Sequence, residues 1–138
     1  MGDPAALARQ AYLGMWQAFV AASQTGDYQS PALSRYAAGA ALALLTRGLY
    51  QNYKEGIVTR GRPAFDPVAT ITGTPAGEPS QARVTDCANS ASWLNYYKSG
   101  KPAPGAPPGK QRVNASLETF DGTWKVTTLV VEKEGTCA

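Results

Sequence analysis

The chain has 138 residues, of which 43% are hydrophobic and 17% charged, and its formal net charge is +3. This composition favours a single globular domain with a real core over a disordered chain. The 13 Lys and Arg residues are scattered, with the densest group at 59–63, so nucleic acid is not an expected partner. The chain has no histidine, which excludes Ser-His-Asp and Cys-His catalytic pairs and zinc sites with imidazole ligands.

The first predicted element is a helix at 4–23. Pro4 suits its first turn, and Asp3 is placed to cap it. Apolar residues recur at three- and four-residue spacing, which indicates one buried face. The residues of this face are Tyr12, Met15, Trp16, Phe19 and Ala22.

A second helical pattern covers 31–55. Gly39 is expected to divide it into a short helix and a longer one, and Gly56 is placed as the glycine that ends it. The longest apolar run of the chain, 36–45, lies in this segment and has about half the length needed to span a bilayer. The sequence therefore predicts packed helices here and no transmembrane segment.

From residue 57 the pattern changes to short segments rich in β-branched and aromatic residues, which is typical of strands. Asp121 and Gly122 predict a tight hairpin turn between the last two strands. In the last strand, alternation places Trp124, Val126, Thr128 and Val130 on one face. The predicted strands lie at 57–60, 64–72, 82–88, 92–98, 112–120 and 123–133.

The order of these elements predicts an α+β domain over 1–138. Helices at about 4–55 are expected to pack on one face of a curved, mostly antiparallel sheet at about 57–135. A loop rich in proline and glycine, 99–110, precedes the last hairpin. No nucleotide loop, flavin or nicotinamide fingerprint, or haem motif is present, so we expect no cofactor and no metal.

The two cysteines, Cys87 and Cys137, are separated by fifty positions. Metal-binding cysteines usually lie closer together, and a thiol nucleophile would need a base that the chain lacks. Two buried free thiols are the remaining alternative to a disulfide, although one of them would lie at the chain end. We predict a disulfide, which indicates an oxidising compartment and an exported protein.

Four stretches carry a resemblance to a known family: "YAAGAALALLTRGLY" (36–50), "VTDCANSASWLNY" (84–96), "PPGKQRVNASLETFDGTWKV" (107–126) and "EGTC" (134–137). They resemble the nuclear transport factor 2-like superfamily, also described as cystatin-like, and are most similar to small secreted proteins and lipoproteins of actinobacteria. This resemblance implies a cone-shaped α+β barrel, with helices in the concave face of the sheet and a pocket at the wide end. It also implies a secreted or lipid-anchored location. The first residues, "MGDP", look like an added start, so the lack of a visible signal peptide says little about export.

Enzymes of that superfamily, such as ketosteroid isomerases, polyketide cyclases and epoxide hydrolases, hold a carboxylate inside the cone. The candidates for this role here are Asp86 and Asp66. Asp66 precedes a proline and has the alternative role of a solvated turn acid. Asp86 alternates with inward residues and has the alternative role of a structural acid bonded to Arg60, Arg83 or backbone amides.

A set of aromatic side chains is predicted to line the pocket, with ordinary core packing as the alternative. Arg60 and Arg62 lie either near an anionic ligand or in solvent. The predicted pocket residues are Tyr12, Trp16, Tyr36, Tyr50, Tyr53 and Trp93, with Tyr96 as a further member of the set.

Three functions are consistent with these residues. The first is an exported, non-catalytic domain that binds a small apolar ligand or a cell-envelope protein. The second is a cofactor-free isomerase, cyclase or epoxide hydrolase that uses a pocket Asp. The third is an assembly component of an envelope secretion or conjugation system, with an exposed apolar surface. The resemblance also implies that the protein forms a homodimer. Contact with a membrane is expected only through a natural lipid anchor.

Overall fold

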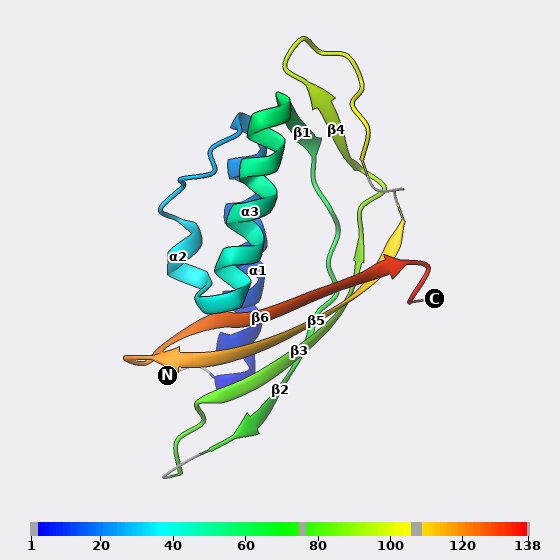
Figure 1. Ribbon diagram of the computed structural model, residues 1–138. Coiled ribbons are helices and arrows are strands. Elements are labelled where there is room, and N and C mark those ends of the chain that lie inside the picture. Colours follow the sequence, from blue (N-terminus) through cyan, green and yellow to red (C-terminus); the bar gives the residue numbers. More distant parts are fainter. Residues whose placement is uncertain (1–2, 75–76, 106–108, 138) are drawn as a thin grey trace.

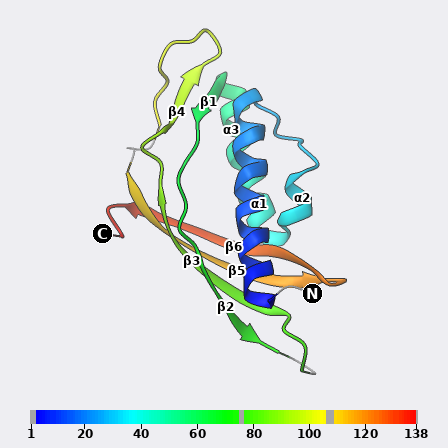
Figure 2. The same ribbon diagram turned by 180° about the vertical axis from the view of Figure 1, so that it is seen from behind.

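The computed structural model describes residues 3–74, 77–105 and 109–137. Within these residues, three helices precede six strands, which confirms the predicted α+β class. Figures 1 and 2 show the helices lying along the concave side of a strongly curved sheet. Part of the predicted loop, residues 106–108, lies outside the described residues.

Helix α1, Pro4–Thr25, is the longest helix and faces the sheet along most of its length. Asp3 occupies the predicted cap position, but its side chain makes no capping hydrogen bond. The helix ends at Gly26, which has a left-handed φ of 73° and donates its N–H to the carbonyl of Ala22. Its buried residues include Ala8, Ala11, Tyr12, Met15, Trp16, Val20, Ala22 and Ser23.

Helices α2, Leu33–Tyr36, and α3, Gly39–Glu55, are separated where the sequence predicts a division. The break is fixed by the last strand, because the Ala38 N–H donates to the carbonyl of Val126 at 2.9 Å. Gly39 follows with a φ of 55°, a backbone conformation that residues with a Cβ rarely adopt. The short linker between the helices is therefore bonded to the sheet.

Four antiparallel strands form the main sheet in the order β2-β3-β5-β6, and β1 pairs with β4 in a separate antiparallel sheet. The predicted strand at 64–72 begins only at Val68, because the N–H of Asp66 bonds to a side chain and Pro67 has no N–H. The strands are β1 Ile57–Gly61, β2 Val68–Gly73, β3 Gln81–Asn89, β4 Trp93–Tyr97, β5 Lys110–Phe120 and β6 Thr123–Glu134.

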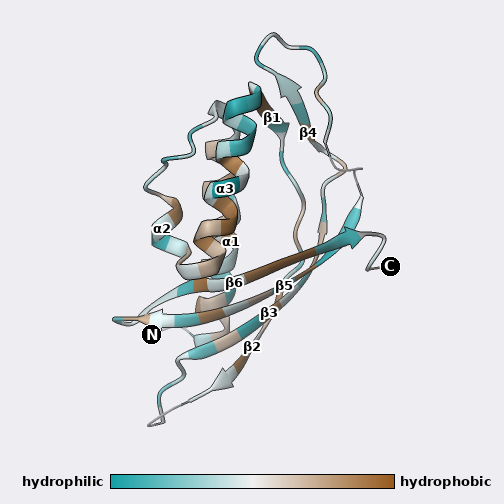
Figure 3. Ribbon diagram, viewed as in Figure 1, coloured by the Kyte–Doolittle hydropathy of each residue, from teal (hydrophilic) through white to brown (hydrophobic). Residues whose placement is uncertain are grey.

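The predicted face of the last strand is wrong after Val126. The register with β5 shifts between Ser116 and Leu117, so one additional residue enters β6 at this point. Leu129 therefore turns into the core, whereas Val130 is 57% exposed on the outer face. Figure 3 shows an apolar stretch in the middle of β6.

The predicted hairpin turn between β5 and β6 is confirmed. Asp121 and Gly122 have φ values of 51° and 81°, as a two-residue turn with left-handed positions requires. Cys87 and Cys137 form a disulfide with a Cα–Cα distance of 5.9 Å, which ties the C-terminal end of the chain to β3. No helix among the described residues is long and apolar enough to cross a membrane.

Candidate functional site

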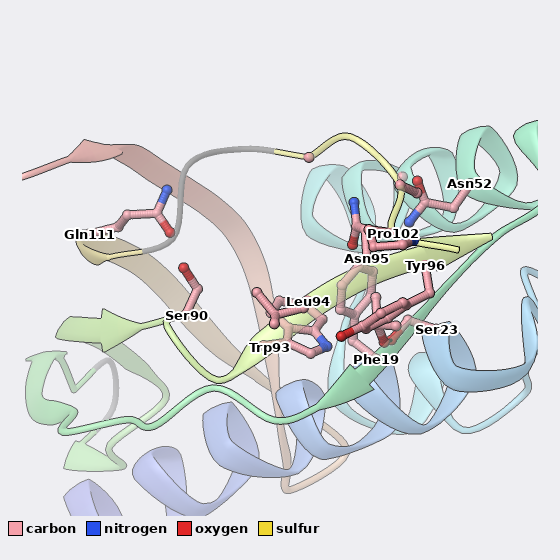
Figure 4. A pocket seen from close by; sticks show the side chains of 14 residues that line it. Phe19, Ser23, Asn52, Ser90, Trp93, Leu94, Asn95, Tyr96, Pro102 and Gln111 are labelled. Carbon is pink, nitrogen blue, oxygen red and sulfur yellow. Dashed lines mark hydrogen bonds between the residues drawn. The ribbon is translucent and has the colours of Figure 1, made fainter. Parts of the chain in front are cut away.

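A cavity of about 540 Å³ lies between the helices and the separate β1–β4 sheet. Figure 4 shows Phe19 and Ser23 entering it from α1, and Trp93 and Leu94 from β4. The lining residues are Phe19, Ser23, Gly48, Asn52, Thr59, Ser90, Trp93, Leu94, Asn95, Tyr96, Pro102, Ala103, Gly105 and Gln111. Most of these positions are apolar, amide or hydroxyl residues, so the site suits an uncharged molecule with a few polar atoms.

The cavity exists because β1 and β4 separate from the main sheet. Gly61, the last residue of β1, has a φ of 81°, and a Cβ at this position would overlap the carbonyl oxygen of Ser92. The next residue, Arg62, donates its N–H to the same carbonyl at 3.1 Å. This close backbone contact is possible only with glycine and turns the chain away from the β1–β4 pair.

The segment after β4 folds back over the cavity. Asn95 Nδ2 donates to the carbonyl of Pro104 at 3.1 Å, and the backbone carbonyl of Asn95 accepts the N–H of Ala103. A further backbone bond joins the Tyr97 N–H to the carbonyl of Lys101 at 2.8 Å. These bonds hold Pro102 and its neighbours against the cavity as an ordered wall.

Two buried hydroxyl groups form the polar side of the cavity. Ser23 Oγ donates to the carbonyl of Val20 at 2.7 Å and lies 2.5 Å from Thr59 Oγ1. A serine has only one hydroxyl proton, so when Ser23 donates to Val20, Thr59 is the donor in the second bond. Both protons are then used inside the protein, and only oxygen lone pairs remain to accept a hydrogen bond from the cavity.

Trp93 provides an unpaired donor in the same lining. Its indole Nε1 is buried and has no acceptor among the described residues. The ring is held edge-to-face by Phe19, at 5.9 Å between ring centroids, and by Trp16, at 6.4 Å. A buried N–H without an acceptor costs about 1–3 kcal/mol, so a molecule that supplies a hydrogen-bond acceptor here would gain affinity.

No Asp, Glu, Lys, Arg or Cys belongs to the cavity lining among the residues that the structure describes. Arg60 lies against one lining residue, with its guanidinium 4.7 Å from the centre of the Tyr96 ring. Arg62 lies instead at a second groove of about 400 Å³, beside Trp16 and Phe65. Neither candidate cation therefore enters the main cavity.

Asp86 lies in the core and makes two hydrogen bonds of 2.7 Å. One carboxylate oxygen accepts the hydroxyl of Tyr12, and the other accepts the backbone N–H of Asp66. Asp86 is only 2% exposed, and it lines none of the three described grooves and cavities. Arg60 and Arg83, the arginine partners considered from the sequence, point elsewhere: Arg60 covers Tyr96, and Arg83 is exposed.

Burial raises the pKa of the Tyr12 phenol well above its usual value. The hydrogen bond to Asp86 and the negative charge of that carboxylate raise the pKa further, and the Trp16 side chain opposes this slightly. Tyr12 is therefore a neutral donor that holds the buried carboxylate. The side chain of Asp66, the other candidate acid, is exposed to solvent.

Three of the six predicted aromatic pocket residues, Tyr12, Trp16 and Trp93, pack on one another, but of the six only Trp93 lines the main cavity. Trp93 lines the main cavity, whereas Trp16 lies in the core beside the second groove. Tyr12 is held in the core by Asp86, and Tyr36 packs on Gly14 next to a third groove. Tyr50 and Tyr53 are 43% and 47% exposed, because the inward stripe of α3 is Ala41, Leu45 and Leu49.

No protein-family model matches the sequence, and no curated protein is significantly similar to it. Solved structures do match. The intermembrane space region of chloroplast protein ARC6 is 13% identical, with a TM-score of 0.62, over 97% of this chain and 99% of that one. A candidate scytalone dehydratase from Novosphingobium aromaticivorans is 12% identical, with a TM-score of 0.55, over 100% and 99%. A candidate aromatic ring hydroxylase from the same organism is 14% identical, with a TM-score of 0.54, over 91% and 87%.

This chain shares with these structures an α+β fold in which helices pack on a curved antiparallel sheet, consistent with the nuclear transport factor 2-like fold. The match covers nearly the whole chain, and the identities of 12–14% carry the fold alone. Within that fold, the interior between α1 and the main sheet is filled by side chains such as Met15, Trp16 and Leu117. The open space lies at the end, under β1 and β4.

Proposed function

We propose that this protein is an exported, non-catalytic domain that binds a small, uncharged, mainly apolar molecule in the cavity between α1, α3 and the β1–β4 sheet. The observation that carries the proposal is the buried, unpaired N–H of Trp93, in the same lining as the Ser23 and Thr59 hydroxyls. The ligand would accept a hydrogen bond at Trp93 and donate one near Thr59. Its apolar part would lie against Phe19 and Leu94.

The position of Asp86 supports binding rather than acid–base catalysis. A catalytic carboxylate must reach a proton of the substrate, and a desolvated carboxylate beside a cavity would meet that need. Asp86 instead uses both oxygens to hold Tyr12 and the backbone of Asp66. We therefore assign Asp86 to the structure, joining α1 to β3 and to the turn before β2.

The disulfide supports an extracytoplasmic location, because such bonds persist mainly in oxidising compartments. The structurally similar region of ARC6 is from an intermembrane space, which is also outside the organelle's inner compartment. We infer a secreted or lipid-anchored protein, in line with the sequence resemblance to small actinobacterial secreted proteins and lipoproteins.

Native mass spectrometry tests the binding proposal directly. The purified protein is incubated with a solvent extract of bacterial cells, separated from unbound material, and measured under native and then denaturing conditions. We expect additional mass in the native spectrum only, and recovery of the same compound, unchanged, after denaturation. The absence of any bound compound would contradict the proposal. Turnover of the compound that disappears in Asp86→Asn would replace binding with catalysis.

Two substitutions connect binding to the cavity. Thr59→Val keeps the side-chain shape and removes the hydroxyl, and Trp93→Phe removes the indole N–H. Each is expected to weaken binding about 3- to 10-fold, the usual effect of one lost hydrogen bond. Thr85→Val is the matched control, because Thr85 lies exposed on the outer face of β3. An equal effect of the control and of Thr59→Val would place the ligand elsewhere.

A further inference from the structure

The fold brings together basic residues that look scattered in the sequence. Residues 57–65 and 87–105 contain no Asp or Glu, whereas the rest of the chain, with nine basic and ten acidic residues, is close to neutral. The antiparallel pairing of β1 with β4 and the turn after β4 place 57–60 and 94–101 at one end of the molecule, where α3 ends (Figure 1). Their basic residues are Arg60, Lys98 and Lys101.

Exposed tyrosines from α3 lie at the same end. Tyr50 and Tyr53 pack on Tyr28 with centroid distances of 5.0 and 4.8 Å, yet remain 43% and 47% exposed. Lysine ammonium groups flank the two rings, with Lys54 5.7 Å from the Tyr50 centroid and Lys98 5.8 Å from that of Tyr53. The two rings and the two lysines therefore lie together, and one exposed acid, Glu55, follows Lys54 in the chain.

The β1–β4 sheet extends this surface. Tyr97 is 37% exposed on one face of this sheet, and Leu94 and Arg60 are exposed on the other face, so both faces of the sheet contribute to this end of the molecule. The Lys98 N–H donates to the carbonyl of Gly56 at 3.0 Å, so the end of α3 and the end of β4 are joined by a backbone bond. We name this surface the basic aromatic end and define it by Tyr50, Tyr53, Arg60, Tyr97, Lys98 and Lys101.

We propose that the basic aromatic end docks the protein on an anionic lipid bilayer. Tyrosine suits the boundary between lipid head groups and acyl chains, because its ring is apolar and its hydroxyl polar. Long basic side chains bury their aliphatic stems and keep their charges at the head groups. Exposed tyrosines among cations favour a membrane over a soluble polyanion, which needs the charges alone.

This docking does not depend on the ligand of the cavity, so either proposal can fail alone. The experiment measures partition of the purified protein onto vesicles of phosphatidylcholine mixed with phosphatidylglycerol, and onto vesicles of phosphatidylcholine alone. Each cation near an anionic membrane changes partition by about five-fold. The triple variant Arg60→Gln/Lys98→Gln/Lys101→Gln is therefore expected to bind the mixed vesicles about 100-fold less tightly.

A matched control removes the same charge elsewhere. Arg35→Gln/Arg83→Gln/Lys133→Gln substitutes three exposed cations outside the basic aromatic end. It is expected to keep most of the binding, because charges beyond about 10 Å are screened at ordinary ionic strength. Equal losses in the two triple variants would overturn the proposal, since only net charge would then matter.

A second variant separates the membrane from other acidic partners. Tyr50→Ser/Tyr53→Ser is expected to lower partition onto the mixed vesicles while leaving retention on a poly-glutamate column unchanged. If the tyrosine variant alters neither measurement and the basic triple variant lowers both, the end binds acidic macromolecules through charge, and the membrane proposal is wrong. Failure of the wild-type protein to prefer the mixed vesicles would also refute it.

Discussion

Removing the Tyr12 hydroxyl tests whether the Asp86–Tyr12 pair is structural. Tyr12→Phe keeps the ring, which is fully buried between Trp16 and Phe65, and deletes the donor of the 2.7 Å bond to Asp86. A hydrogen bond to a charged group contributes about 1.5–3 kcal/mol, so the free energy of unfolding should fall by about 2 kcal/mol at pH 7. Equilibrium urea unfolding measures this difference.

The same variant gives a pH dependence with a definite sign. Tyr12 in the unfolded chain ionises near pH 10, whereas burial and Asp86 raise its pKa in the folded protein. Above pH 10 the unfolded state therefore releases a proton that the folded state keeps, and unfolding becomes more favourable as the pH rises. The wild type should lose about 1.4 kcal/mol from this residue between pH 9 and pH 11, and Tyr12→Phe should lose none of it.

The stability difference between wild type and Tyr12→Phe should thus shrink from about 2 to below 1 kcal/mol as the pH approaches 11. Tyr50→Phe is the control, because Tyr50 is 43% exposed and should give a small difference at every pH. All other ionisable groups titrate in both the wild type and the variant, so their effects cancel in the difference. A difference for Tyr12→Phe that stays constant from pH 8 to pH 11 would refute the assignment of Tyr12 as a buried neutral donor.

Two further predictions concern stability. Cys87→Ser/Cys137→Ser opens a loop of fifty residues and should reduce the free energy of unfolding by about 2–4 kcal/mol, measured by urea unfolding; an unchanged midpoint would show that the bridge contributes nothing. Gly61→Ala, where the new Cβ would overlap the Ser92 carbonyl, should destabilise by about 1–3 kcal/mol. Gly48 lies in α3 with open space around it, so Gly48→Ala should stabilise the protein by about 0.5–1 kcal/mol. The melting temperature should therefore fall in Gly61→Ala and rise in Gly48→Ala. A change in the same direction in both variants would contradict these two assignments.

Local signals in the sequence were sufficient for most of the fold. Gly39 and Gly56 mark the ends of helical segments because their positive φ values are positions where glycine is favoured. Asp121 and Gly122 indicate their turn for the same reason. The bulge that turns Leu129 inward has no such marker, because β-branched residues surround it and no glycine or proline is near.

The cavity was harder to predict, because its residues come from elements that are distant in sequence. A usable signal existed at Ser23, which continues the apolar stripe of α1 four residues after Phe19 and is 2% exposed. A hydroxyl at an inward position needs a partner, and that partner, Thr59, lies 36 residues away in β1. The periodicity of the sequence indicates which way a side chain faces, but it does not indicate which distant residue that side chain contacts.

The aromatic residues show the same limit. The helical spacing of Tyr12 and Trp16 correctly indicates an inward face, but an inward face can fill a core as well as line a cavity. The separation of β1 and β4 from the main sheet decides between these two outcomes, and it depends on a backbone contact at Gly61.

Two of the buried polar arrangements among the described residues have different meanings, because one is complete and the other, like the Nε1–H of Trp16, is not. Asp86 has a partner on each carboxylate oxygen, so its hydrogen bonds are accounted for by the fold itself. Trp93 has a buried donor without a partner, and the hydroxyls of Ser23 and Thr59 have acceptor capacity left over. Buried hydrogen-bond donors and acceptors that the fold leaves without a partner are available to a bound molecule. This difference is why we place the ligand under the β1–β4 sheet, and not at the acid that the sequence first suggests.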